Sequence, residues 1–520
     1  MFNHQSRTQN VLKASFTGST CNLINILLGF IYRTIFIRLL SSNYLGINGL
    51  FSNILQILSF ADLGISTAIV YRFYEPISRN DIYKVGQLMN FFKSIYQGIA
   101  LIILLIGLSL LPFLKFFIKD TTELPQDVNL QVVYVLFLVQ TISSYLFVYK
   151  QTILSADQKQ YISSLIQTLL ILTRYLLQIL TLVLTRNYIW TLAGSIILNI
   201  SMNLIFSEWV SHKYKDVFNI KESITKEEKK QIFDDTKATL CHKIGGTVLT
   251  STDNIVLSKC VGIVATGLYS NYSMVLTSLS GIINQIFGSF TSSLGNAHVE
   301  QTVEQKYISY KHLLFGNLWM TSICTVCLYN LLSDFIVIWV GHEMLLDNLT
   351  VTVLCIQFFI ETARIISMSY TNGCGLFVKD KIRPLIESAI NLGISIIMAG
   401  LFGIAGVFIG TIISHLSTVF WREPYLLYKY EFKKSMKEYW AYYGIAVILT
   451  VLMNFLINDV ITITFFKQID NLLMWILKAV WVFTTCNIFL VVCLYRNSDF
   501  KFFSNFVIKK FKNENVTNSR

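Results

Sequence analysis

The chain alternates between long apolar stretches and short polar connections along almost its whole length. An apolar window of about 20 residues is long enough to cross a bilayer as a helix, and the sequence holds fourteen of them. They cover approximately residues 15–40, 46–71, 86–114, 128–149, 161–184, 188–210, 244–258, 265–294, 312–332, 350–371, 384–401, 404–421, 438–458 and 471–495. A helix satisfies all its backbone polar groups within one spanning segment. The pattern predicts an all-α integral membrane protein with about 14 transmembrane helices.

Lysine and arginine in the connections indicate the orientation of these spans. Fourteen spans place both ends of the chain on one side, where the connections hold 31 of these residues; the opposite side holds 5, and 6 lie within spans. Because cytoplasmic loops carry an excess of positive charge, both termini are predicted to be cytoplasmic, in a bacterial plasma membrane. The same bias explains the net charge of +12, so a nucleic-acid partner is not expected.

Composition narrows the class of protein further. Only 14% of the residues are charged and the mean hydropathy is +0.55, whereas soluble domains carry about 25% charged residues. The sequence contains no phosphate-binding loop and no metalloprotease or serine-hydrolase motif. The nine cysteines lie almost entirely in apolar stretches, where packing is the simplest role. We therefore expect neither an enzyme nor a cofactor or metal, and any driving energy must come from gradients or the membrane potential.

Two short motifs recur at nearly the same offset. Gly49-Leu-Phe-Ser-Asn53 returns 218 positions later as Gly267-Leu-Tyr-Ser-Asn271, and Leu165-Ile-Gln167 returns 220 positions later as Leu385-Ile-Glu387. This spacing predicts a duplicated bundle, an architecture typical of alternating-access transporters. The expected divisions are an N-terminal six-helix lobe (1–210), a cytoplasmic linker (211–243), a C-terminal six-helix lobe (244–421), a cytoplasmic loop (422–437), two additional helices (438–495) and a cytoplasmic tail (496–520).

Polar residues within the first-half spans are candidates for substrate binding, because such groups normally face a bundle interior or a wet cavity. On the first span, Gly18, Asn22, Asn25, Gly29 and Arg33 follow one another at intervals of three or four residues, which places them on one helical face. Arg38 lies near the outer end, where reaching to the interface is the simpler role. Arg174 lies in the middle of the fifth span.

Acidic residues in the spans suit either ion coupling or structural pairing. On the second span, Gln56 belongs to a polar stripe that ends at Asp62, which could pair with an arginine of the first span. The remaining candidates lie in the second half: Asp253 on the seventh span, Glu361 and Arg364 spaced to pair on one helix, and Glu387, which the repeat aligns with Gln167.

Four segments resemble bacterial polysaccharide repeat-unit flippases of the Wzx type, within the multidrug/oligosaccharidyl-lipid/polysaccharide exporter superfamily. They are Arg38-Leu-Leu-Ser-Ser-Asn-Tyr-Leu-Gly-Ile-Asn-Gly-Leu-Phe51, Ala61-Asp-Leu-Gly-Ile-Ser66, Ser251-Thr-Asp-Asn-Ile-Val-Leu257 and Gly267-Leu-Tyr-Ser-Asn-Tyr272. The resemblance covers essentially the whole chain as twelve spans plus two.

The resemblance implies a pair of six-helix lobes that flip an undecaprenyl-diphosphate-linked oligosaccharide to the outer leaflet through a cationic central cavity. Membrane lipids and a polysaccharide polymerase are further expected partners, and the two extra helices could offer a groove for the lipid tail. Arginine suits a diphosphate because its planar donor set stays charged at any depth. The expected substrate-binding residues are Arg33, Arg174, Arg38, Arg364, Asn22, Asn25, Gln56 and Asn271.

Three other functions fit parts of the sequence. A Na⁺- or H⁺-coupled multidrug exporter of the same superfamily would rely on Asp62, Asp253, Glu361 and Glu387. A lipid II flippase would share the anionic lipid substrate. A membrane-embedded polymerase or ligase is disfavoured, because such enzymes often carry a large extracytoplasmic loop and the longest outer loop here, Lys115 to Asp127, is short.

Overall fold

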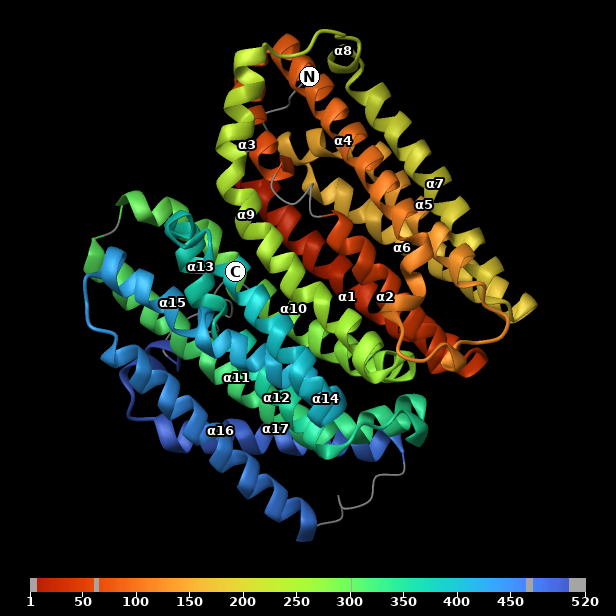
Figure 1. The fold of residues 1–520 in the computed structure, drawn as a ribbon. Helices are drawn as coiled ribbons and strands as arrows, with labels where there is room; N and C mark the ends of the chain where they lie inside the picture. Colours follow the sequence, from red (N-terminus) through yellow and green to blue (C-terminus); the bar gives the residue numbers. More distant parts are fainter. Residues whose placement is uncertain (1–6, 60–64, 301, 464–470, 505–520) are drawn as a thin grey trace, which may run out of the picture. The chain divides into compact units, whose positions relative to one another are not determined.

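The computed structural model describes residues 7–59, 65–300, 302–463 and 471–504, and within them the regular elements are helices (Figure 1). In the first half these are α1 (Arg7–Leu39), α2 (Ser42–Leu58), α3 (Ile65–Ser78), α4 (Ile82–Leu110), α5 (Leu130–Ala156), α6 (Gln160–Thr185), α7 (Tyr188–Lys213), α8 (Lys215–Phe218) and α9 (Lys226–Val256). They are followed by α10 (Ile263–Glu300), α11 (Val303–Val340), α12 (Asn348–Ala363), α13 (Ile365–Gly373), α14 (Arg383–Ser417), α15 (Val419–Leu426), α16 (Lys437–Ile463) and α17 (Leu472–Leu494).

Ten of the described helical stretches are long and apolar enough to cross a membrane, so the chain is a multi-pass membrane protein. One stretch, Arg383–Phe432, contains two predicted spans. At Gly403, with φ 56°, the chain folds back, so that Ser395 Oγ donates a hydrogen bond to Val407 O at 2.9 Å. The predicted spans 46–71, 244–258 and 265–294 are not among the ten, and the first includes residues outside the described part. The count of fourteen stays a prediction.

The linker predicted over 211–243 is largely helical. After α8, Thr225 begins α9 with a capping box, in which its hydroxyl accepts the Glu228 N–H and the Glu228 carboxylate accepts the Thr225 N–H. Lys84 at the start of α4 forms a 2.5 Å salt bridge with Glu228. Asn90 of α4 donates to Ile220 O at 2.6 Å, so the linker packs against α4.

The described helices gather into two compact units. The first comprises Met1–Ser270 and Lys381–Leu392, and the second comprises Asn271–Asp380 and Gly393–Arg520. In the first unit α1 packs along α6, and α5 and α6 pack along α7. In the second unit α11 is central and contacts α12, α16 and α17. The boundaries of the two six-helix lobes that the repeat indicates stay a prediction.

Close backbone contacts beside the repeated motif join α2 to the start of α10 within the first unit. A methyl group on Gly46 of α2 would lie 3.0 Å from the carbonyl carbon of Ile263, and one on Gly267 of α10 would lie 2.9 Å from that of Ser42. Only glycine allows backbones this close together. Glu123, in the connection between α4 and α5, accepts the N–H groups of Ile263 (2.9 Å) and Val264 (3.3 Å) and so holds the start of α10.

Candidate functional site

A polar cavity of about 400 Å³ lies between α1, α5 and α6 in the first unit. The predicted polar face of the first span supplies Gly18, Asn22 and Asn25 to its wall. The other lining residues are Cys21, Val148, Gln151, Thr152, Ser155, Gln160, Ser163, Ser164 and Gln167. Two cross-helix contacts join α5 and α6 here: Gln167 Nε2 donates to Gln151 Oε1 at 3.3 Å, and Ser155 bonds Gln160. We call this space the α1–α5–α6 cavity.

The helices α1 and α6 run parallel beyond this cavity and meet again at two tyrosines. The rings of Tyr32 and Tyr175 stack with their centroids 4.8 Å apart and an interplanar angle of 16°. Because residues 18–25 lie beside residues 160–167 at the cavity and Tyr32 lies beside Tyr175, the same register holds along both helices. Parallel α1 and α6 are what the predicted span order requires, because they are the first and fifth predicted spans and three spans lie between them.

The two strongest substrate-binding candidates of the first half flank this stack. Arg33 follows Tyr32 in α1, and its Nη2 donates a hydrogen bond to Ser270 Oγ at 2.5 Å. Arg174 precedes Tyr175 in α6, and its guanidinium lies 5.2 Å from the centre of that ring. Both guanidiniums are near enough to the Tyr32 phenol to interact with it electrostatically. The structure thus brings Arg33 and Arg174 to one place, which we call the Arg–Tyr site.

Arg174 differs from Arg33 in its hydrogen bonding. Its Nε atom is buried and has no hydrogen-bond partner, and among the described residues no carboxylate lies within ion-pair distance of it. A charge in a membrane segment is costly unless it is paired or faces water or a ligand. An anionic group with several acceptor oxygens would supply what the guanidinium lacks.

The remaining candidates differ in their exposure. Arg38 and Gln56 are exposed. Asn271, the last residue of the repeated motif, is fully buried in the second unit, and Asp253 is partly buried in the first. Asp62 lies outside the described residues, so its predicted pairing with an arginine has no structural counterpart here.

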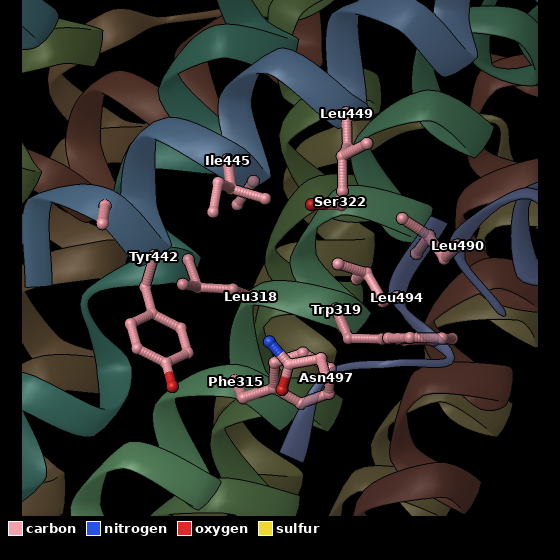
Figure 2. Close-up of a pocket in the computed structure, with 12 residues that line it drawn as sticks. Phe315, Leu318, Trp319, Ser322, Tyr442, Ile445, Leu449, Leu490, Leu494 and Asn497 are labelled. Carbon is pink, nitrogen blue, oxygen red and sulfur yellow. The ribbon is translucent and has the colours of Figure 1, made fainter. Parts of the chain in front are cut away.

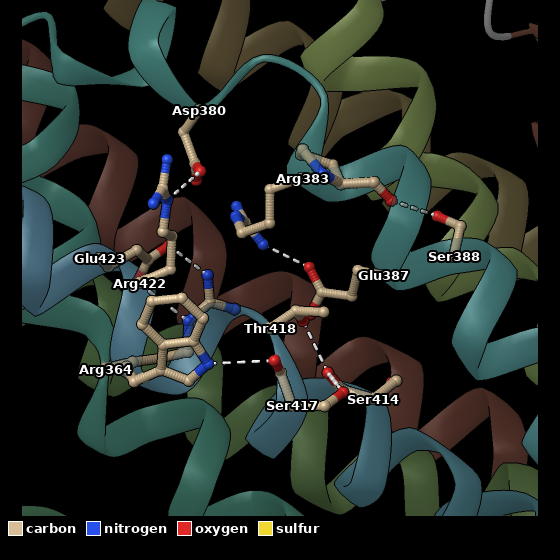
Figure 3. A network of polar contacts seen from close by, with 12 residues as sticks. Arg364, Asp380, Arg383, Glu387, Ser388, Ser414, Ser417, Thr418, Arg422 and Glu423 are labelled. Carbon is tan, nitrogen blue, oxygen red and sulfur yellow. Dashed lines mark hydrogen bonds and ion pairs between the residues drawn. The ribbon is translucent and has the colours of Figure 1, made fainter.

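In the second unit, arginines pair with carboxylates on other helices. Arg364 donates from Nη2 to Glu423 Oε1 at 2.5 Å and from Nε to Oε2 at 3.2 Å, and Arg422 donates to Asp380 at 3.2 Å (Figure 3). The predicted pairing of Arg364 with Glu361 on the same helix stays a prediction, and the ion pair that the structure shows for Arg364 is the one with Glu423. Arg364 ends α12, where its side chain reaches the bidentate carboxylate of α15, while Glu361 accepts a hydrogen bond from Gln357 at 2.8 Å.

Glu387 forms its salt bridge within α14. Arg383, one turn earlier, donates to Glu387 Oε2 (Figure 3), and only 2% of Glu387 is exposed. Nearby on the same helix, Asn391 accepts a hydrogen bond from Thr252 of α9 at 3.3 Å. The residue that the repeat aligns with Gln167 is therefore a paired, buried carboxylate, whereas Gln167 itself lines the α1–α5–α6 cavity.

An apolar pocket of about 220 Å³ lies between α11, α16 and α17 in the second unit (Figure 2). Its wall is mostly aliphatic and aromatic, and Figure 2 shows Leu318 and Trp319 of α11 facing Ile445 of α16 and Leu490 of α17. The predicted additional helices α16 and α17 thus border a space that suits hydrocarbon. Within the described residues, no three His, Cys, Asp or Glu side chains are grouped as metal ligands.

Several site residues were missed at the sequence level although a signal was present. Gln160, Ser163, Ser164 and Gln167 follow the spacing of one helical face, and Arg174 lies two turns further on. The tyrosines that stack between the arginines gave no signal, because a tyrosine beside an arginine in an apolar run is equally compatible with packing. Glu423 and Asp380 were missed as partners because both lie at predicted span ends, far in sequence from their arginines.

Comparisons with known proteins were made for sequence and for fold. The profile of a family described as polysaccharide biosynthesis protein matches residues 11–290, more than half of the chain. No match was found among curated protein sequences.

Solved structures share the fold over most of the chain. The lipid II flippase MurJ in an inward closed conformation is 16% identical, with a TM-score of 0.64 over 92% of this chain and 99% of that chain. An inward-facing multidrug resistance MATE family transporter of the MOP superfamily is 13% identical, with a TM-score of 0.60 over 79% and 98%. A MOP superfamily transporter from Pyrococcus furiosus, described with a binding pocket of reverse polarity, is 13% identical, with a TM-score of 0.54 over 81% and 96%.

Proposed function

Because the chain belongs to the polysaccharide biosynthesis protein family and has the fold of MOP superfamily transporters, we propose that it is a lipid-linked oligosaccharide flippase. Its substrate is an undecaprenyl-diphosphate-linked repeat unit, moved from the inner to the outer leaflet of a bacterial plasma membrane for assembly into a surface polysaccharide. Both termini are cytoplasmic. The all-α membrane fold and the family resemblance expected from the sequence are confirmed by these comparisons.

The observation that carries this proposal is the Arg–Tyr site. Arg33 and Arg174 meet at one stacked tyrosine pair on two parallel helices, and Arg174 has a buried donor without a partner. A diphosphate offers the negative charge and the acceptor oxygens that such a pair can bind through planar, charge-assisted hydrogen bonds. The site therefore binds the diphosphate while the protein alternates between inward and outward exposure, with the apolar pocket of α11, α16 and α17 receiving part of the lipid tail.

A cation exporter of the same fold is the main alternative. Of the membrane acids that it would use, the buried Glu361 accepts a hydrogen bond from Gln357, whereas Glu387 forms a salt bridge with Arg383, which argues against its use. A buried acid that is already neutralised binds a second cation poorly. A lipid II flippase would share the anion-binding argument and differs only in the saccharide and peptide carried on the lipid.

The test is carried out in cells that lack this gene and are complemented with variants of matched expression. Replacing Arg33 and Arg174 together with Gln should cause lipid-linked repeat units to accumulate in the cytoplasmic leaflet, with loss of surface polymer. Arg186→Gln, which removes an exposed cation at the C-terminal end of α6, is the control and should export normally. Normal surface polymer in the double variant would refute the proposal. Altered drug sensitivity with normal polymer would favour the exporter.

A further inference from the structure

The α1–α5–α6 cavity is lined by polar side chains that carry no charge. Nine of its twelve lining residues have a hydroxyl or amide side chain, and none is acidic or basic. Such a wall offers no counter-charge to a phosphate, a carboxylate or an ammonium group. It also suits a hydrocarbon tail poorly, because polar groups would lose their hydrogen bonds against it.

Part of the hydrogen-bonding capacity in this wall is unused. Asn25 Oδ1 and Ser163 Oγ are buried and have no hydrogen-bond partner among the described residues. The Gln167–Gln151 contact, at 3.3 Å, is longer than a typical hydrogen bond. Buried polar atoms in proteins normally have a hydrogen-bond partner in the protein, in water or in a ligand. A polar ligand in this cavity could therefore form hydrogen bonds with these atoms.

The amide and hydroxyl groups of the cavity wall indicate the chemistry of its ligand. Amides and hydroxyls both donate and accept hydrogen bonds, so their natural complement is a molecule with many groups that do the same. Sugar hydroxyl and acetamido groups fit this description, and neutral sugars need no counter-charge. Acidic sugars would place a carboxylate where no cation lines the wall.

The cavity also lies at a useful place along the two helices. Arg33 is eight residues beyond Asn25 on α1, about 12 Å along the axis, and Arg174 is seven residues beyond Gln167 on α6, about 10 Å. Because α1 and α6 are parallel, both helices offer the same sequence of surfaces, first uncharged and polar, then cationic. A substrate with a diphosphate at one end and sugars beyond it presents the same order.

We propose that the α1–α5–α6 cavity is a saccharide subsite that binds uncharged, hydroxyl- or acetamido-bearing sugar residues of the lipid-linked substrate. This inference rests on the proposed function, since the Arg–Tyr site must bind the diphosphate for the sugars to reach the cavity. Asn25, Gln167 and Ser163 contact the sugars directly. They set the preference for neutral repeat units, while Arg33 and Arg174 bind any lipid diphosphate.

The test compares three probes with the purified full-length protein in lipid nanodiscs. They are geranyl diphosphate, the same lipid carrying one N-acetylglucosamine, and the same lipid carrying one glucuronic acid. For the wild type, the neutral sugar should tighten binding about tenfold over the sugar-free probe, as two net hydrogen bonds would. Glucuronic acid should give no gain.

Gln167→Leu is matched by Gln178→Leu, which makes the same change on the same helix but outside the cavity wall. Gln167→Leu should abolish the gain from N-acetylglucosamine and leave the affinity for geranyl diphosphate within about twofold, whereas Gln178→Leu should keep the gain. Equal thermal midpoints for both variants and the wild type exclude misfolding as the cause.

Three results would overturn the subsite. They are no gain from N-acetylglucosamine in the wild type, an equal gain from glucuronic acid, or a gain that survives Gln167→Leu. If geranyl diphosphate itself fails to bind the wild type, the proposed function fails and the subsite fails with it. Because the sugar-free probe reports on the Arg–Tyr site alone, the two failures are distinguishable.

Discussion

The close backbone contact between α2 and α10 gives a sharp prediction for Gly267→Ala. The added methyl would lie 2.9 Å from the Ser42 carbonyl carbon and 3.3 Å from the Gly46 nitrogen, so α2 and α10 must separate. Forced overpacking costs about 1–3 kcal/mol, and the upper half applies because the obstacle is backbone. Alanine returns about 1 kcal/mol of helix propensity. We expect a net loss of about 1–2 kcal/mol of stability.

The assay is thermal unfolding of the purified full-length protein in one detergent, followed by the fluorescence of its eight tryptophans. The control is Gly98→Ala in α4, where the added methyl meets nothing within 4 Å and should leave the midpoint unchanged or higher. Gly46→Ala should behave like Gly267→Ala. The double variant should lose less than the sum, because the first methyl already separates the helices. A Gly267→Ala protein as stable as Gly98→Ala would refute the reasoning, as would strictly additive losses.

Three further predictions concern charged contacts. Arg364→Gln should destabilise the protein by about 3–5 kcal/mol by leaving the buried Glu423 unpaired, and Arg364→Gln/Glu423→Gln should recover much of the loss in the same unfolding assay. Glu123→Gln should cost about 1 kcal/mol there, because it removes an anion from the start of α10. The hydrogen bond from Lys84 lowers the pKa of Glu228 below its ordinary value of 4.5, so this contribution to stability is present above pH 4.5 and disappears as the pH falls through the lowered pKa. The protection factor against hydrogen exchange at the start of α9 should fall on that acidification in the wild type and fall less in Lys84→Met, in which Glu228 keeps only its capping-box contacts.

The membrane class and most helices could be predicted from the sequence. Unpaired backbone groups and polar side chains are unfavourable in hydrocarbon, so each span must be a helix made mostly of apolar residues. The same argument located Asn22 and Asn25 on one face, which the structure places in the cavity wall. The two predicted spans 384–401 and 404–421 lie on either side of Gly403, where the chain folds back. Properties that depend on one helix alone could therefore be predicted from the sequence.

Properties that depend on which helices meet were not accessible. Arg364 could pair with Glu361 by helical spacing, yet Glu423 on another helix offers a bidentate carboxylate. The convergence of Arg33 and Arg174 required the register of α1 against α6, which hydropathy does not encode. Glu123 and the close contacts of Gly46 and Gly267 hold the start of α10 within the first unit, and the apolar pattern of α10 does not encode these contacts.

The attachment of α10 to the first unit has a consequence for biosynthesis. The ribosome completes the first six predicted spans before it reaches Gly267. Until then the face of α2 around Gly46 lies in the membrane without α10, the helix that packs against it in the finished protein. During the same period Glu123 lacks the N–H groups of Ile263 and Val264, from which its carboxylate accepts hydrogen bonds in the finished protein. The nascent first half is therefore an unfinished structure that exposes a narrow backbone surface to lipid.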